Sequence, residues 1–520
     1  MTVKRFILGL LTLLAVARVL LSLGGSLAQP QIQSRLELYQ TNLVLYAAEF
    51  QADLDNDDLK KALAQGLGED PTAAALKQYD KARKEVVEFR NTFQKQLPAI
   101  ANSDSDLTEV NNRAVVADSN KPLREQLQQQ VADLNNFIHE IDVKRGILSA
   151  EQDDTAAARE IWQQLITSID NPEDKYYQTA TVLNKLWSAN PEVSDNARNI
   201  ITENLDSWFR DRSLAKFYTV TNDTTQLTVL NNTQQQLASS AIVKLAMISA
   251  IPFLGGIVGF ILLVSLSIQL LLKKEKALLA TNSNFNWQTP WDWEITWQVI
   301  IIGFFFVGQF LLPLLLGIVG FNVAEASIRA KAIYILFTYI LMAAGGITVL
   351  YLSIKPYLPL SQEWFKAQLR DRWFLWGFGG YLVAIPCVLF VSLINQQIWH
   401  GQGGSNPLLY LALQAQDKVA LAIFFFTASI AAPVFEELIF RGFLLPSLTR
   451  YMSVTTAIIL SGLLFAVAHL SLAEVLPLAT LGIILGVVYT RSRNILAPML
   501  LHSLWNSGTL LSLFVLGSGT

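Results

Sequence analysis

Two adjacent carboxylates interrupt an apolar stretch in the last third of the chain, in the segment APVFEELIFRGFLL. Glu437 and Arg441 are four residues apart, so a helix would place them on one face, where they can pair. Glu436 would point about 100° away from that face and has no helical partner. Burial of an unpaired carboxylate disfavours its ionised form. Such a group suits a general base or acid that works near neutral pH.

Two further polar pairs lie in apolar segments that follow the carboxylates. Phe465 and His469 occur in LLFAVAHLS, and His502 and Asn506 occur in LLHSLWNSG. The four-residue spacing predicts one helix face for each pair. A single His in an apolar helix is usually held by an interhelical hydrogen bond. Several ionisable groups together in membrane spans instead indicate a functional site. The candidate catalytic residues are Glu436, Glu437, Arg441, His469, His502 and Asn506.

Hydrolysis by an activated water molecule fits these residues better than attack by a side chain of the protein. The sequence has no G-x-S-x-G motif, and its single cysteine, Cys387, has no His nearby and reads as a packing residue. Glu436 would take a proton from water, while the imidazoles and the Asn506 amide would hold the water or stabilise an oxyanion. We expect no cofactor. A zinc ion held by Glu436, His469 and His502 is the alternative, although the H-E-x-x-H pattern is absent.

The three motifs EELIFR, FAVAH and HSLWN resemble the EExxxR, FxxxH and HxxxN signatures of the CPBP family, the CAAX proteases and bacteriocin-processing enzymes. This family is related to the type II CAAX prenyl endopeptidases and is also called the abortive-infection domain. The resemblance covers about residues 373–517. It implies an intramembrane glutamate endopeptidase that acts on membrane-associated proteins or peptides.

The resemblance also implies a role for each motif. Glu436 would activate water together with His469, and His502 with Asn506 would form the oxyanion site. The paired Glu and Arg of the first motif would support Glu436. The overall arrangement resembles the long CAAX-type proteins of cyanobacteria, which implies a plasma (inner) or thylakoid membrane.

The composition predicts an all-α, polytopic membrane bundle around these motifs. Hydrophobic residues make up 52% of the 520 residues and charged residues 16%, whereas soluble domains average about 25% charged residues. Spans of about 20 apolar residues cross a bilayer, and in lipid they must be helical. We predict eight spans after residue 240, at 245–272, 297–320, 331–353, 373–396, 420–446, 453–472, 474–490 and 495–517.

The chain before these spans divides into an N-terminal apolar segment and a polar block. Residues 1–29 read as a signal peptide or a retained anchor, since Lys4 and Arg5 precede an apolar run. Residues 30–240 read as an acidic helical domain. The block 31–240 has a net charge of −11 against −3 for the whole chain, which leaves +8 on the remainder. The additional spans then occupy 241–372 and the catalytic membrane domain 373–520.

The distribution of Lys and Arg predicts the topology. These residues are concentrated in alternate short loops after residue 240, which places those loops in the cytoplasm. The acidic domain 30–240 is then extracytoplasmic, in agreement with an export signal before it. It is a candidate surface for a protein partner, and its lone His139 is expected to be structural. The net charge of −3 argues against a nucleic-acid partner.

Tryptophans gather at two places that we interpret as interfacial aromatic belts, with a substrate-binding surface as the alternative. They are Trp287, Trp291, Trp293 and Trp297 in one group and Trp364, Trp373 and Trp376 in the other.

Two other classes of function remain open at the level of sequence. A catalytically silent scaffold would use the soluble domain to recruit a partner and the polar groups only to hold helices together. A transporter would use intramembrane charges as an ion path, but the two halves of the membrane region lack a matching pair of broken helices.

Overall fold

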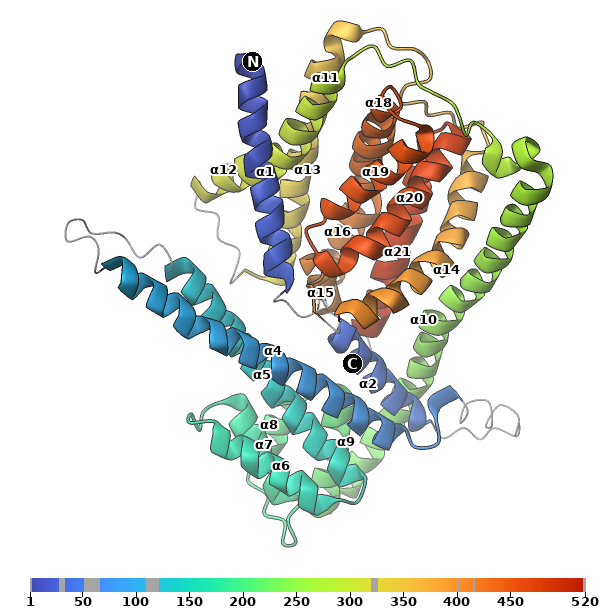
Figure 1. The fold of residues 1–520 in the computed structure, drawn as a ribbon. Helices are drawn as coiled ribbons and strands as arrows, with labels where there is room; N and C mark the ends of the chain where they lie inside the picture. The colour runs from blue at the N-terminus through green and yellow to red at the C-terminus, as the bar shows by residue number, and fades with distance from the viewer. Residues whose placement is uncertain are drawn as a thin grey trace. The chain divides into compact units, whose positions relative to one another are not determined.

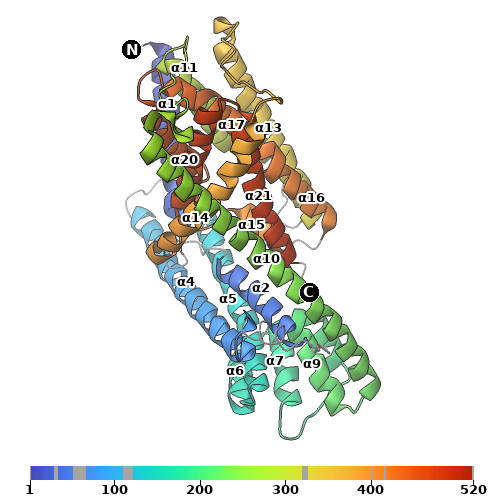
Figure 2. The same cartoon turned by 90° about the vertical axis from the view of Figure 1, so that its right-hand side faces the viewer.

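The computed structural model describes residues 2–27, 33–50, 66–108, 121–318, 326–399, 402–414 and 417–517 (Figures 1 and 2). All of the regular elements within these ranges are helical, which confirms the all-α prediction. The chain forms two compact units. One contains Met1–Gln31 and Ile248–Gly517, and the other contains Ile32–Met247. The predicted boundary at 240/241 lies inside one continuous helix, α10 (Thr224–Lys273), which continues from one unit into the other.

The unit Ile32–Met247 is a bundle of amphipathic helices. Its helices are α2 (Gln33–Ala48), α4 (Pro71–Thr108), α5 (Lys121–Glu151), α6 (Thr155–Ser168), α7 (Lys175–Leu186), α8 (Ala197–Asn204), α9 (Ser207–Val220) and the start of α10. Asp154 and Asp174 cap α6 and α7 by accepting hydrogen bonds from the first free backbone N–H groups. Trp162 is fully buried, and its indole N–H donates to the Val143 carbonyl over 3.2 Å.

A buried lysine of α5 links this helix to the start of α9. Lys144 lies 2.8 Å from Glu140 and 3.0 Å from Asp206, and its ammonium lies 5.4 Å from the centre of the Phe209 ring. Burial alone would lower the pKa of Lys144, but the two carboxylates raise it well above its usual value. His139 packs edge-to-face on Tyr176 at 5.8 Å, and its burial lowers the pKa of the imidazole.

The other unit is the membrane bundle. Its single helices are α1 (Val3–Leu27), the apolar part of α10, α13 (Ile328–Ile354), α14 (Trp373–Trp399), α15 (Pro407–Gln414), α19 (Val454–Val467), α20 (Val475–Ser492) and α21 (Leu496–Gly517). One composite stretch consists of α11 (Trp293–Gln298), η3 (Val299–Leu311) and α12 (Leu312–Ile318). A second consists of α16 (Lys418–Phe426), η5 (Thr427–Ala431), α17 (Ala432–Glu437), η6 (Leu438–Leu444) and α18 (Leu445–Leu448). Short 3-10 turns are η1 (Lys274–Lys276), η2 (Leu278–Ala280), η4 (Lys355–Tyr357) and η7 (Leu472–Glu474).

Eight helical stretches in the described residues are long and apolar enough to cross a membrane. They are 3–27, 224–276, 293–318, 328–357, 373–399, 418–448, 472–492 and 496–517. The chain is therefore a multi-pass membrane protein. Helices α14, α20 and α21 pack together, and α19 packs along α20 (Figures 1 and 2).

The predicted span 453–472 is shorter than expected. It forms only α19, a helix of 14 residues that ends at Val467. The backbone leaves the helix at Ala468, and Leu470 adopts a positive φ of 59°. His469 therefore lies just beyond the helix and not within its face.

The interpretation of Trp287, Trp291 and Trp364 as belt residues is wrong. These three side chains are buried, with exposures of 4%, 0% and 6%. Trp287 donates to the Glu363 carbonyl and Trp364 to the Gln288 carbonyl, so the loops before α11 and before α14 hold each other. Their indole groups are packed between loops and helix ends, and they do not face lipid. Trp293, in contrast, is 48% exposed.

Helix α1 packs within the membrane unit. Arg5 and Lys4 form ion pairs with Glu294 of α11 at 2.8 and 3.0 Å. Thr12 accepts a hydrogen bond from the Trp297 indole over 2.7 Å, and Ser26 accepts one from the Leu472 backbone N–H over 3.1 Å.

Candidate active site

Five of the six candidate residues converge on one cluster of side chains within the membrane unit. Glu436 and Glu437 lie at the end of α17 and Arg441 in η6, while His469 follows α19 and His502 lies on α21. Contacts of 4.0 Å or less join all five to one another, directly or through a neighbour in the cluster.

The predicted pair of Glu437 and Arg441 is confirmed. Arg441 Nη1 donates to Glu437 Oε1 over 2.9 Å, and both side chains are fully buried. Arg441 Nη2 donates to the Gly482 carbonyl of α20 over 2.9 Å. The close packing of α20 on α19 depends on two facing glycines, Gly482 and Gly462. A Cβ added at Gly482 would lie 2.8 Å from the Gly462 Cα. These two hydrogen bonds of the buried guanidinium fix the position of the Glu437 carboxylate.

Glu437 in turn orients His502. The imidazole Nδ1 lies 2.9 Å from Glu437 Oε1, and the His502 side chain is 3% exposed. Because an ionised carboxylate only accepts hydrogen bonds, Nδ1 carries the proton that it shares with Glu437. His502 Nε2 is then directed away from Glu437 and lies 4.0 Å from Glu436 Oε2. This is the carboxylate–imidazole arrangement that sets a histidine's tautomer in many active sites.

His469 approaches Glu436 in the same way. Its Nδ1 lies 2.8 Å from the Phe465 carbonyl, an acceptor, so Nδ1 carries a proton here also. Its Nε2 lies 4.0 Å from Glu436 Oε2, and the side chain is 22% exposed. The Phe465 ring packs edge-to-face on both imidazoles, at 4.8 and 5.5 Å, and the Arg441 guanidinium lies 4.5 Å from its centre. The Phe465 ring therefore contacts His469, His502 and Arg441.

One carboxylate oxygen of Glu436 accepts a hydrogen bond, and the other has no partner among the described protein groups. Oε1 accepts a hydrogen bond from the Tyr339 hydroxyl over 3.1 Å. Oε2 is buried and accepts no hydrogen bond from the described protein groups. Both imidazole Nε2 atoms lie at 4.0 Å from this same oxygen. A separation of 4.0 Å is the distance between two acceptors that share one bridging donor at about 2.8 Å from each.

Asn506 lies one turn after His502 on α21, and its described contact leads elsewhere. Its Nδ2 donates to the Ala428 carbonyl over 2.7 Å, and Ser503 Oγ donates to the Ser429 carbonyl over 2.6 Å. These carbonyls lie in η5, a π-helical turn. Pro433 lacks the N–H that would pair with Ser429 in an α-helix or with Ala428 in a π-helix. Asn506 and Ser503 replace the missing donor and attach α21 to this turn.

Tyr339 was not among the sequence candidates. It lies on α13 in the apolar segment YILFTYILMAAGG, and it reaches Glu436 because Gly346 allows α13 to approach α17 closely. An added Cβ at Gly346 would lie 2.8 Å from the Phe435 ring and 2.9 Å from the Gly303 carbonyl. The hydroxyl of a tyrosine within a membrane span needs a hydrogen-bond partner, as a charged group does. A search of the spans for tyrosines would therefore have included Tyr339 among the candidates.

We predict that Tyr339→Phe lowers kcat by about 5- to 30-fold and leaves KM unchanged, because one hydrogen bond that positions Glu436 is lost. Steady-state kinetics of the purified full-length protein measure both constants. Tyr351→Phe is the matched control, since Tyr351 lies on the same helix and is 51% exposed. An unchanged kcat in Tyr339→Phe would contradict the positioning role.

The same distances decide whether a metal ion fits this cluster. Tetrahedral zinc ligands at about 2.0–2.1 Å from the metal lie about 3.3 Å from one another, whereas Glu436 Oε2 lies 4.0 Å from each Nε2. Within the described part of the chain, no three His, Cys, Asp or Glu side chains form a cluster that could hold a metal. The geometry as it stands does not fit zinc, and we derive no step through a metal.

Comparisons with known proteins agree with the motifs. Residues 418–508 match the family described as type II CAAX prenyl endopeptidase Rce1-like. That range contains all six candidate residues but not Tyr339. The membrane-embedded CAAX protease MroQ of Staphylococcus aureus (strain USA300) is 27% identical over 221 residues, which cover 41% of this chain and 86% of that relative.

A second relative matches a shorter stretch. The putative membrane peptidase YdiL of Bacillus subtilis (strain 168) is 25% identical over 133 residues, which cover 26% of this chain and 53% of that protein. This chain therefore spans about half the length of the second relative. No solved structure matches the chain.

Proposed function

We propose that this chain is a membrane endopeptidase of the CPBP family of CAAX proteases and that it hydrolyses peptide bonds with a water molecule activated by Glu436. The match of residues 418–508 to the Rce1-like family and the likeness to MroQ support the class of enzyme. The observation that carries this proposal is the position of Glu436 Oε2, buried and 4.0 Å from the Nε2 atoms of both His469 and His502.

In the proposed mechanism two acceptors, Glu436 Oε2 and His469 Nε2, hold one water molecule, and Glu436 is the base. A water between Glu436 Oε2 and His469 Nε2 donates one hydrogen bond to each, so its oxygen lone pairs are directed away from both and toward a substrate carbonyl. As the oxygen attacks, its proton passes to Glu436. Glu436 then holds the proton that the departing amine requires, and Tyr339 keeps its carboxylate in place throughout.

The position of His502 suggests the oxyanion donor. Its Nδ1 lies 2.9 Å from Glu437 Oε1, which holds the ring, and its Nε2 lies 4.0 Å from Glu436 Oε2. As an imidazolium, His502 would donate from Nε2 to the oxyanion while Nδ1 remains on Glu437. Asn506 has a second N–H besides the one on Ala428 and would supply the other donor.

The proposed substrates are membrane-associated proteins or peptides, prenylated or not. The concentration of Lys and Arg after α10, α13, α18 and α20 supports an extracytoplasmic position for residues 30–240. The contacts of α1 with α11 and with Leu472 support its retention as a membrane anchor.

The test uses purified full-length protein reconstituted with a membrane-protein extract, with new N-termini identified by mass spectrometry. We expect His469→Gln to lower the rate of cleavage by about 10²-fold or more, because the second acceptor of the water is lost. We also expect a zinc chelator to leave wild-type cleavage unchanged. Full cleavage by His469→Gln would overturn the proposed base. Loss of activity with the chelator and recovery with zinc would instead identify a metal-assisted hydrolase.

A further inference from the structure

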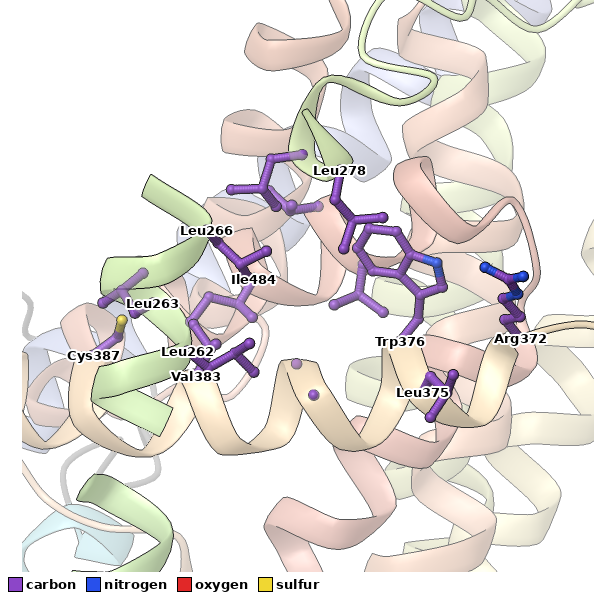
Figure 3. Close-up of a pocket in the computed structure, with 15 residues that line it drawn as sticks. Leu262, Leu263, Leu266, Leu278, Arg372, Leu375, Trp376, Val383, Cys387 and Ile484 are labelled. Carbon is purple, nitrogen blue, oxygen red and sulfur yellow. The ribbon is translucent and has the colours of Figure 1, made fainter. Parts of the chain in front are cut away.

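An apolar groove of about 390 Å³ lies between α10, α14 and α20, apart from the candidate active site (Figure 3). Aliphatic side chains make up about two thirds of its lining, among them Leu262 and Leu266 of α10, Val383 of α14 and Ile484 of α20. Figure 3 shows Arg372 beside Trp376 at one end of the lining and Cys387 at the other. None of the six motif residues, nor Tyr339, contributes to it.

The groove runs along the membrane-spanning part of α14. Arg372 directly precedes the span that begins at Trp373, so it lies where the chain enters the bilayer. Fifteen residues of α-helix separate Arg372 from Cys387, a rise of about 22 Å. One leaflet of a bilayer has about 15 Å of hydrocarbon. The groove can therefore accept an acyl chain along the full depth of a leaflet.

Small residues keep the groove open on the α14 side. Gly379 lies in its wall, and a Cβ added there would meet only the end of the Leu262 side chain, at 3.8 Å. A larger side chain at this position would therefore extend into the groove without displacing backbone.

The cation at the mouth of the groove is available, whereas its neighbours are engaged. Arg491 donates to the Leu279 carbonyl over 2.6 Å, and Arg493 pairs with Glu363. The Arg372 side chain is exposed and makes no hydrogen bond or ion pair among the described residues. Basic groups at the ends of apolar clefts between membrane helices bind anionic lipid headgroups.

We propose that this groove binds one acyl chain of an anionic glycerophospholipid whose phosphate lies on Arg372. The bilayer is the solvent of these helices, so hydrocarbon is the occupant that matches the lining. The unpaired guanidinium adds a preference for a negatively charged headgroup. The bound lipid would lie against α20 through Ile484, while Gly482 of the same helix accepts the hydrogen bond from Arg441.

Cys387 is the only cysteine of the chain and lines the groove, so it reports occupancy directly. The experiment measures the rate at which N-ethylmaleimide labels Cys387 in the delipidated full-length protein in detergent. Phosphatidylglycerol and phosphatidylcholine with identical acyl chains are added in turn. At a phosphatidylglycerol concentration about ten times its Kd, we expect labelling to slow about tenfold. Phosphatidylcholine at the same concentration should protect less.

Two variants and their matched controls separate the contributions of the headgroup and the chain. Arg372→Gln should weaken protection by phosphatidylglycerol about fivefold, whereas Arg370→Gln, an exposed arginine of the same loop outside the lining, should not. Gly379→Leu should lower lipid retention in native mass spectrometry. Gly317→Leu adds the same side chain at an exposed position where nothing lies within 4 Å and should have no effect.

Three results would overturn the proposal. Equal protection by both lipids would show an unselective apolar surface. Equal loss of protection in Arg370→Gln and Arg372→Gln would show a general surface charge effect. Stronger protection by a farnesylated peptide than by phosphatidylglycerol would identify a substrate site instead. The labelling readout does not use proteolysis, so it is independent of the proposed catalytic mechanism.

Discussion

The Glu436→Gln variant is expected to fold and to lose about 10²- to 10⁴-fold in kcat, the contribution typical of a positioned general base. Glutamine has the shape of glutamate, and its amide oxygen can still accept the Tyr339 hydroxyl that now binds Oε1. It cannot take a proton from water. KM should change little, because no substrate-binding contact is removed. The measurement is the rate of formation of new N-termini by wild-type and variant protein under single-turnover conditions.

A control glutamate in the same unit distinguishes loss of the base from loss of a charge. Glu294 pairs with Lys4 and Arg5 outside the candidate site. Glu294→Gln should retain activity. Thermal unfolding should show that Glu436→Gln is as stable as wild type or slightly more so, since it removes a buried charge. Wild-type rates in a folded Glu436→Gln variant would reject the mechanism and favour a catalytically silent scaffold.

The Arg441→Met variant is expected to lose about 3–5 kcal/mol of stability, because it leaves the carboxylate of Glu437 buried and without its cation. Both side chains are fully buried, and the Gly482 carbonyl loses its donor as well. The apparent melting temperature of the detergent-solubilised protein measures the loss. Activity should fall in parallel, because Glu437 orients His502.

A double variant tests whether the loss comes from the pair. Glu437→Gln with Arg441→Met removes both charges, yet the amide oxygen of the introduced glutamine can still accept from His502. We expect it to be more stable than Arg441→Met alone, with a coupling of about 0.5–3 kcal/mol. Arg329→Met is the comparison at an exposed pair, since Arg329 binds Asp417 with 54% of its side chain exposed, and it should lower the melting temperature far less than Arg441→Met. Equal losses at both arginines would contradict the role of burial.

The parts of the site that depend on helical spacing could be read from the sequence. The four-residue interval between Glu437 and Arg441 predicted their pairing, and they do pair. The same geometry left Glu436 without a helical partner, which agrees with its contact to another helix. Apolar length likewise predicted most of the spans, because the bilayer imposes one requirement on every segment.

The parts that depend on tertiary contact or local backbone conformation could not be read in this way. Leu470 lies between His469 and Ser471 in a segment without Gly, Asn or Pro, so no residue type marks the positive φ that follows the end of α19. Trp291 has the same residue type as a belt tryptophan, but its indole donates to Ser447 and packs on Phe443. A tryptophan that faces lipid and one packed between loops have the same sequence signal, and only their neighbours distinguish them.

The hydrogen bond from Tyr339 to Glu436 implies that a minimal active fragment must include α13. The three motifs lie between residues 436 and 506, yet one donor to the Glu436 carboxylate comes from α13, which precedes the region of resemblance at 373–517. A fragment cut at residue 373 would keep every signature residue and lose this donor, together with the packing of Gly346 on Phe435. Variation along α13 could therefore tune the reactivity of relatives whose motifs are identical.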